Sequence, residues 1–265
     1  MITVKLMNPN VVDHLYESHG KFASVCYDSP EEQAVHIGKA CQESGHMSGS
    51  RCEYIIFRIS GLDRGTAEQI MRHELGTAVP IEMQDNYSFE DYLDAVTSIP
   101  SDHIVKNCAS FRYIDKEGFT WATPRSISQC PAAKAEYDDL MRLINEKRVV
   151  IKQALEASGC PGRVATQDAN FVLPRATTTE LMIGFTPEAL IHFCHKRMCS
   201  RAQEFIREIA FKMRDEIFEY SPRLAWEMKP HCEYLMWCPE GRHSCGRHPS
   251  KLELQQHLYE ASRKE

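Results

Sequence analysis

Residues 171–210 read FVLPRATTTELMIGFTPEALIHFCHKRMCSRAQEFIREIA, and this stretch decides the fold. The run TTTELMIGF at 177–185 is rich in β-forming residues and predicts a strand. Thr186-Pro187 follows, and proline at the first helical position favours a helix start there. A longer helix is predicted over roughly 200–219, because apolar residues recur at helical spacing. Its inward residues are Ala202, Phe205, Ile206, Ile209, Met213 and Ile217.

Similar patterns predict the other elements. Strands are predicted at 2–7 and 53–60 and in a hairpin over 111–124, while helices are predicted from Ser29, over 63–75 and over 132–157. The inward face of the last helix is predicted to carry Leu140, Leu143, Ile144, Ile151 and Leu155. We therefore expect an α+β fold, a single domain with a central sheet and long helices.

Two segments depart from these periodic patterns. Residues 77–106 contain two prolines, acidic clusters and little periodicity, which indicates an insertion or lid. Residues 229–265 begin with a stretch rich in Cys, His, Gly and Pro. The predicted organisation is one domain over 1–228, interrupted at 77–106, followed by a Cys/His-rich tail over 229–265.

Composition excludes several classes of function. The chain has 265 residues, a formal charge of −6 and a pI of about 6.1, which disfavours duplex nucleic acid as a partner. We expect no membrane span, because no apolar run approaches the roughly 20 residues that one needs. The N-terminus has no apolar core followed by a cleavage site, so we expect a cytoplasmic protein. The 11 cysteines show no regular framework, and reduced thiols are expected.

Two short stretches combine side chains that bind phosphate. On a helix, Gln69 lies beside Arg72 and His73, so an amide, a guanidinium and an imidazole share one face. Ser110 and Arg112 would face the same side of a strand. Each group suits a phosphorylated ligand, and each also fits a solvated surface.

Two further constellations lie near the C-terminus. The helix that begins near Thr186 offers free N–H groups and a positive dipole end for an anion. His192, Arg197 and Arg201 lie on it or just past it, where the arginines could also be ordinary surface residues. The tail carries Cys232, Cys238, His243, Cys245 and His248. Their C-x5-C and C-x2-H spacings differ from paired zinc-binding units, so no metal ligand is predicted.

Taken in order, these motifs resemble the flavin-dependent thymidylate synthase family. The strongest match is Val172-Leu173-Pro174, Thr179, Arg197, Ala202-Gln203 and Ile206-Arg207-Glu208. A second consists of Gly45-His46, Glu53-Tyr54, Ala67, Gln69, Arg72 and His73, and a third of Ser110, Arg112, Tyr113, Phe119 and Pro124. The closing CPEG and SCG also resemble some members.

The resemblance implies an activity and a set of partners. The protein would be a homotetramer with FAD at its subunit interfaces, converting dUMP to dTMP with methylenetetrahydrofolate and NADPH as cosubstrates. Arg197 and Ser110 match the catalytic positions. The dUMP-binding positions are Gln69, Arg72, Ser110, Phe111, Arg112, Asn170 and Arg197. The flavin-binding positions are His46, Ser50, Arg72, His73, Glu74, Thr186 and His192.

Some positions differ from the family pattern. Arg72-His73-Glu74 stands where the family has Arg-His-Arg, and Asn170 stands where an arginine is common. Two alternatives therefore stay open. One is a related flavin enzyme that modifies C5 of another pyrimidine nucleotide. The other is an inactive paralogue that acts as a binding module, including one stabilised by zinc in the tail.

Overall fold

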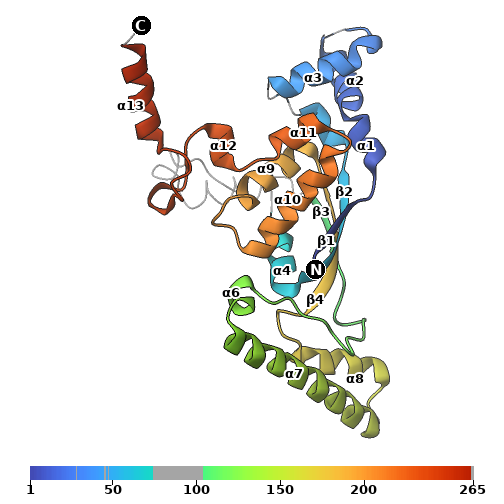
Figure 1. Cartoon of the computed structure of the whole chain (residues 1–265). Coiled ribbons are helices and arrows are strands. Elements are labelled where there is room, and N and C mark those ends of the chain that lie inside the picture. Colours follow the sequence, from blue (N-terminus) through green and yellow to red (C-terminus); the bar gives the residue numbers. More distant parts are fainter. Residues whose placement is uncertain (28, 45, 47, 74–103, 264–265) are drawn as a thin grey trace, which may run out of the picture. The chain divides into compact units, whose positions relative to one another are not determined.

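A computed structural model of the chain describes residues 1–27, 29–44, 46, 48–73 and 104–263 (Figure 1). Four strands form one sheet in the order β1-β2-β4-β3. Their bounds are Thr3–Leu6 for β1, Ile55–Asp63 for β2, Ile104–Cys108 for β3 and Thr178–Phe185 for β4. The strands predicted at 2–7, 53–60 and 177–185 are thus confirmed, and β3 joins them. The predicted α+β class, with a central sheet and long helices, is confirmed.

The alternation of side chains explains why β2 and β4 form the centre of the sheet. Ile55, Phe57 and Ile59 of β2 are fully buried, whereas Arg58 between them is exposed. Leu181 and Ile183 of β4 are also buried and are separated by the exposed Met182. This period of two is the pattern of a strand with one face in the core.

The described chain divides into two compact units. The first contains Met1–Thr3, Arg58–Arg72 and Lys106–Met182. The second contains the described residues of Val4–Phe57, His73–Val105 and Ile183–Glu265. The domain boundary predicted at 228 remains a prediction, and residues 229–263 belong to the second unit.

In the second unit, α1 (Pro9–Asp13), α2 (Leu15–Tyr27) and α3 (Ala34–Glu43) precede β2. The sequence pattern predicts neither α1 nor α2. α2 and α3 lie side by side (Figure 1), and two glycines permit this approach. A Cβ at Gly20 would lie 1.6 Å from the carbonyl oxygen of Ala34, and one at Gly38 would lie 2.0 Å from that of Tyr16. Side chains at either position would force the helices apart.

The helix predicted to begin at Ser29 begins later. A 3-10 turn over Glu31–Gln33 comes first, with the N–H of Gln33 bonded to the carbonyl of Pro30 at 3.1 Å, and α3 starts at Ala34. Serine followed by proline and glutamate is the usual pattern of a capped helix start, but here the proline opens the tighter turn.

The two helices after β4 agree with the sequence pattern. α9 spans Pro187–Arg197, and the Thr186 hydroxyl caps it by accepting a hydrogen bond from the N–H of Ala189 at 3.4 Å. α10 spans Glu204–Phe218 and begins about four residues later than predicted, because the Gln203 side chain caps it. The helices that complete the unit are α11 (Pro222–Glu227), α12 (His231–Leu235) and α13 (Lys251–Ser262).

The first unit holds the longest described helix. α7 spans Pro131–Ala157, as predicted over 132–157, and packs against α8 (Gly162–Ala169). The prediction of its inward face is wrong in part. Met141 and Arg148 are buried, whereas Leu140, Leu143 and Ile151 are exposed. The helix thus turns Met141 and Arg148 inward, and most of the predicted apolar stripe faces outward. Two shorter helices, α4 (Arg64–Met71) and α6 (Arg125–Ser128), also belong to this unit.

The hairpin predicted over 111–124 is wrong. Residues 111–113 form a turn, and the only β pairing described in 111–124 is a bridge between Trp121 and Thr177. The turn of the predicted hairpin, at Lys116-Glu117-Gly118, does form, with Gly118 at φ 65°. A strand does not form before it because the carbonyls of Phe111 and Ile114 bond to the Asn170 side chain instead of a neighbouring strand.

Two expectations concern segments that the structure describes only in part. Residues 77–103 of the predicted insertion lie outside the described residues, and residues 104–106 belong to β3. None of the helices in the described part of the chain combines the length and apolar character that a membrane span requires.

Candidate functional site: a cationic pocket beside strand β3

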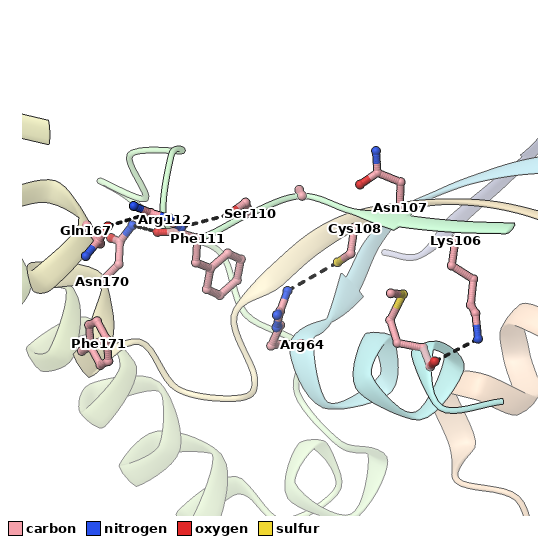
Figure 2. A pocket seen from close by; sticks show the side chains of 12 residues that line it. Arg64, Lys106, Asn107, Cys108, Ser110, Phe111, Arg112, Gln167, Asn170 and Phe171 are labelled. Carbon is pink, nitrogen blue, oxygen red and sulfur yellow. Dashed lines mark hydrogen bonds between the residues drawn. The ribbon is translucent and has the colours of Figure 1, made fainter. Parts of the chain in front are cut away.

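A pocket of about 750 Å³ lies in the first unit, in the size range of small-molecule sites (Figure 2). Residues 106–112 form one side of it, at the end of β3 and in the turn that follows. Arg64 and Met71 come from α4, Gln167 from α8, and Asn170 and Phe171 from the 3-10 turn Asn170–Val172.

Three cations line this pocket. Lys106 Nζ donates to the carbonyl of Met71 at 2.9 Å, and Arg112 Nε donates to Oε1 of Gln167 at 2.7 Å. Arg64 Nη1 lies 3.4 Å from the sulfur of Cys108 (Figure 2). No aspartate or glutamate is among the described residues that line the pocket. The excess of positive charge favours an anionic ligand.

A tight turn after β3 places Ser110, Phe111 and Arg112 at the pocket. The carbonyl of Ser110 accepts hydrogen bonds from the N–H groups of Tyr113 and Ile114 at 3.3 and 3.2 Å. Its hydroxyl accepts from the N–H of Arg112 at 3.2 Å. The prediction that Ser110 and Arg112 face the same side of a strand is therefore wrong, because they lie in a turn. Both residues nevertheless line one pocket, where they could bind the same ligand.

Asn170 ties this turn to the helix behind it. Its Nδ2 donates to the carbonyls of Phe111 and Ile114 at 2.5 and 3.0 Å, and its Oδ1 accepts from Arg148 Nε at 2.8 Å. Arg148 is fully buried and also pairs with Asp115. Both the oxygen and the nitrogen of the Asn170 amide thus form hydrogen bonds with other protein groups, and these bonds hold the turn in place.

The second unit contains another group of predicted site residues. Arg197 Nη2 lies 3.4 Å from Nδ1 of the buried His73, whose ring centroid lies 5.8 Å from that of His192 and 5.0 Å from that of Phe193. Arg197 Nε is buried without a hydrogen-bond partner in the described part of the chain. Burial lowers the pKa of both Arg197 and His192.

The remaining predicted residues lie elsewhere in their units. Gln69 is half-buried on α4 and Arg72 is exposed at its end, and neither lines the pocket. In the second unit, His46 is exposed and its carbonyl lies 2.8 Å from Nε2 of His19, while Ser50 is buried in the 3-10 turn Ser48–Cys52. Glu74 lies outside the described residues.

Several pocket residues were not predicted as ligands. Arg64, Asn107, Gln167 and Phe171 come from segments that are distant in sequence or lack a motif. Arg148, behind the pocket, carried one signal in the sequence, since it lies four residues after Ile144 and seven before Leu155, both of which were predicted to face inward. A charged residue at such a position indicates a buried polar network.

Comparison with known proteins identifies the family. Residues 11–223 match the family model described as "Thymidylate synthase complementing protein". The chain is 33% identical to a flavin-dependent thymidylate synthase of Nitratidesulfovibrio vulgaris over 225 residues, which cover 84% of this chain and 80% of that protein. It is 29% identical to one of Thermococcus kodakarensis over 201 residues, 74% of this chain and 69% of that protein. The chain therefore belongs to the flavin-dependent thymidylate synthase family of enzymes.

Proposed function

We propose that the protein converts dUMP to dTMP, with methylenetetrahydrofolate as carbon donor and NADPH as reductant of a bound FAD. Family membership supports this reaction class. The structural observation that carries the proposal is the cationic pocket, in which Arg64, Lys106 and Arg112 surround a space large enough for a nucleotide. A nucleoside monophosphate has the negative charge that such a lining favours.

We infer separate parts for the residues of the pocket. Arg112 is the main phosphate ligand, since its guanidinium is already oriented by Gln167. Phe111 lies beneath two cations, with Arg64 at 5.1 Å and Lys116 at 4.9 Å from its ring centroid. These contacts hold the turn that carries the Ser110 hydroxyl. Ser110 then binds the nucleotide by a hydrogen bond.

The residues around Arg197 fit a flavin and an electron-rich ring. The buried Nε of Arg197 lacks a partner among the described residues, and the aromatic faces of His73, His192 and Phe193 gather beside it. A buried N–H donor without a partner marks a position where a ligand atom could accept its hydrogen bond. Bound FAD supplies the hydride chemistry. The roles of His46, Ser50, Arg72, Glu74 and Thr186 toward the flavin remain part of this proposal.

Arg197 stabilises the negative charge that develops on the pyrimidine ring. Although burial lowers its pKa, a guanidinium stays protonated in proteins. The lowered pKa of His192 favours a neutral imidazole, which keeps a second positive charge away from Arg197. Arg197 therefore remains the cation that acts on the ring.

The first experiment is an absorption spectrum of the purified protein, followed by titration with dUMP. We expect flavin bands that shift as dUMP binds, and release of tritium from dUMP labelled at C5 when both cosubstrates are present. A protein without flavin would contradict the proposal. Bound flavin with tritium release from another pyrimidine nucleotide, but none from dUMP, would favour the related enzyme instead.

We further propose that the protein is a homotetramer. The support from this chain is the outer face of α7, where Leu140, Leu143, Val150 and Ile151 are exposed. Apolar side chains in a row on a helix are more often covered by a partner than left in water. A second copy of this chain is the partner that the assembly requires.

A further inference from the structure

Four cysteines from separate segments gather in the second unit, and none has a part in the proposed reaction. Cys199 follows α9, Cys232 lies on α12, and Cys238 and Cys245 lie in the loop between α12 and α13. All four line one small cavity of about 30 Å³. That volume holds about one ion or water molecule, and is far too small for an organic ligand.

The sulfurs influence one another. Cys238, Glu233, Cys199 and Cys245 all lie near enough to the Cys232 thiol to act on it electrostatically. Thiolates that share one cavity repel one another. A bound cation removes that repulsion and makes the thiolate the favoured form.

Two imidazoles line the cavity with the cysteines, and each has one ring nitrogen without a hydrogen-bond partner among the described residues. His195 Nε2 and His231 Nδ1 are buried without a partner in the part of the chain that the structure describes. The two rings are stacked with centroids 5.2 Å apart, and both line the same cavity. Imidazoles beside thiols are a donor set typical of zinc.

The surrounding charge suits an anionic metal centre. A divalent cation bound by four thiolates has a net charge of −2. Lys196, Arg201 and Arg247 line the same cavity together with one carboxylate, Glu240, so the lining has an excess of positive charge that offsets such a centre.

The loop needs a cross-link for its own stability. Residues 239–247 are all exposed, and Cys238 is the one buried residue of 236–250. Few contacts fix the loop, among them the hydrogen bond from the N–H of Cys238 to the carbonyl of Pro249 at 2.7 Å. Another joins Arg201 Nη1 to the carbonyl of His243 at 3.3 Å. Segments without an apolar core are commonly held by a metal or a disulfide.

We propose that Cys199, Cys232, Cys238 and Cys245 bind one structural zinc ion that fastens the loop 236–250 to the end of α9. The cysteines whose side chains the structure describes are free thiols. No group of three or more potential ligands among the described residues already stands at metal-binding distances. Binding therefore requires side-chain rotations that draw the four sulfurs around the ion.

The experiment measures zinc in the full-length protein after dialysis against a reductant, which removes any disulfide. We expect one zinc ion per chain in the wild type and in Cys130→Ser, whose cysteine is exposed at the start of α7. Cys199→Ser and Cys232→Ser should lose most of the zinc. X-ray absorption at the zinc edge of the wild type should show sulfur ligands at about 2.3 Å. That measurement does not depend on whether a variant folds.

Three results would overturn the proposal. They are wild-type protein without stoichiometric zinc under reducing conditions, zinc held by oxygen or nitrogen ligands alone, and iron with acid-labile sulfide in place of zinc. Exchange of zinc for cobalt offers a further readout. Tetrahedral cobalt thiolate absorbs in the red, beyond the flavin bands. The cobalt bands should be absent in Cys199→Ser and present in Cys130→Ser.

Discussion

Arg148 Nε donates a hydrogen bond to Asn170 Oδ1 across 2.8 Å, and this contact joins α7 to the turn that lines the pocket. Arg148 is fully buried and also pairs with Asp115, so α7 carries a guanidinium directly behind the position where an arginine is common in the family. The guanidinium of Arg148 supports the turn by its hydrogen bond to Asn170. It does not reach the pocket itself, since Arg148 is not among the lining residues.

Replacement of Arg148 tests this support. Arg148→Met should destabilise the protein by about 2–3 kcal/mol, because the buried Oδ1 of Asn170 loses its hydrogen-bond partner, while the partly exposed Asp115 keeps its pair with Lys152. In thermal unfolding, this corresponds to a decrease in Tm of about 5–10 °C for a chain of this size. Arg142→Met is the matched control, since Arg142 pairs with Asp139 on the same helix with both side chains exposed. Similar decreases in both variants would contradict the role of Arg148.

Asn170→Ala tests the turn separately from the charge. The variant loses the hydrogen bonds to the carbonyls of Phe111 and Ile114, so Ser110 and Arg112 lose their fixed positions. We expect the KM for dUMP to rise roughly tenfold, which corresponds to about 1.4 kcal/mol of lost binding. The control is Asn145→Ala, whose side chain also bonds a backbone group, the N–H of Gly118, but does not line the pocket. An unchanged KM in Asn170→Ala would show that the turn keeps its shape without the amide.

The charge of the pocket is tested at Arg112. Arg112 and Arg163 each lie 5.4 Å from the ring centroid of Tyr113, but only Arg112 lines the pocket. Arg112→Ala should raise the Kd for dUMP about 10- to 30-fold, because a charged hydrogen bond to phosphate contributes about 1.5–2 kcal/mol. Arg163→Ala should leave the Kd nearly unchanged. Equal effects in the two variants would place the phosphate elsewhere.

The sequence predicted the elements whose signals are local. The strand at 177–185, the proline-led helix after Thr186 and the helix over 132–157 each carry their pattern in consecutive residues, and all three are confirmed. α2 was missed because its sequence, LYESHGKFASVCY, has no clear apolar stripe, and its packing depends on Gly20 meeting the backbone of α3.

The pocket was predictable only in part. Ser110, Phe111, Arg112 and Asn170 were identified through the family resemblance, and all four line it. Arg64 and Gln167 could not be found from the pattern, because the folding of β3, α4 and α8 brings them together. The same limit applies to Cys199, which lies 33 positions before Cys232 and forms no motif with it.

Acid stability should depend on Asp115. Hydrogen bonds from Lys152 and Arg148 hold the pKa of this carboxyl at about 2, below the roughly 3.9 expected in the unfolded chain. A carboxyl whose pKa is depressed by folding stabilises the protein above its unfolded pKa. That contribution is lost as the pH falls from about 4 toward 2.

Measurements of Tm against pH for the wild type and for Asp115→Asn test this dependence. The variant should have a lower Tm at neutral pH, and its Tm should fall less steeply below about pH 4. Asp139→Asn serves as the control, because Asp139 is a largely exposed carboxylate on α7 and its variant should follow the wild-type curve. Parallel curves for all three proteins would contradict the prediction.

The outer face of α7 provides the test of assembly. Leu143 is 47% exposed there, in a row with Leu140 and Val150, and a charge at its position would oppose burial against another copy. Leu143→Glu should therefore shift the mass in solution below that of a tetramer, as measured by light scattering during size-exclusion chromatography. Leu258→Glu adds the same charge at an exposed leucine of another helix, α13, and should leave the mass unchanged. A tetramer that persists in Leu143→Glu would show that another surface joins the subunits, whereas a wild type that is already monomeric would contradict the assembly itself.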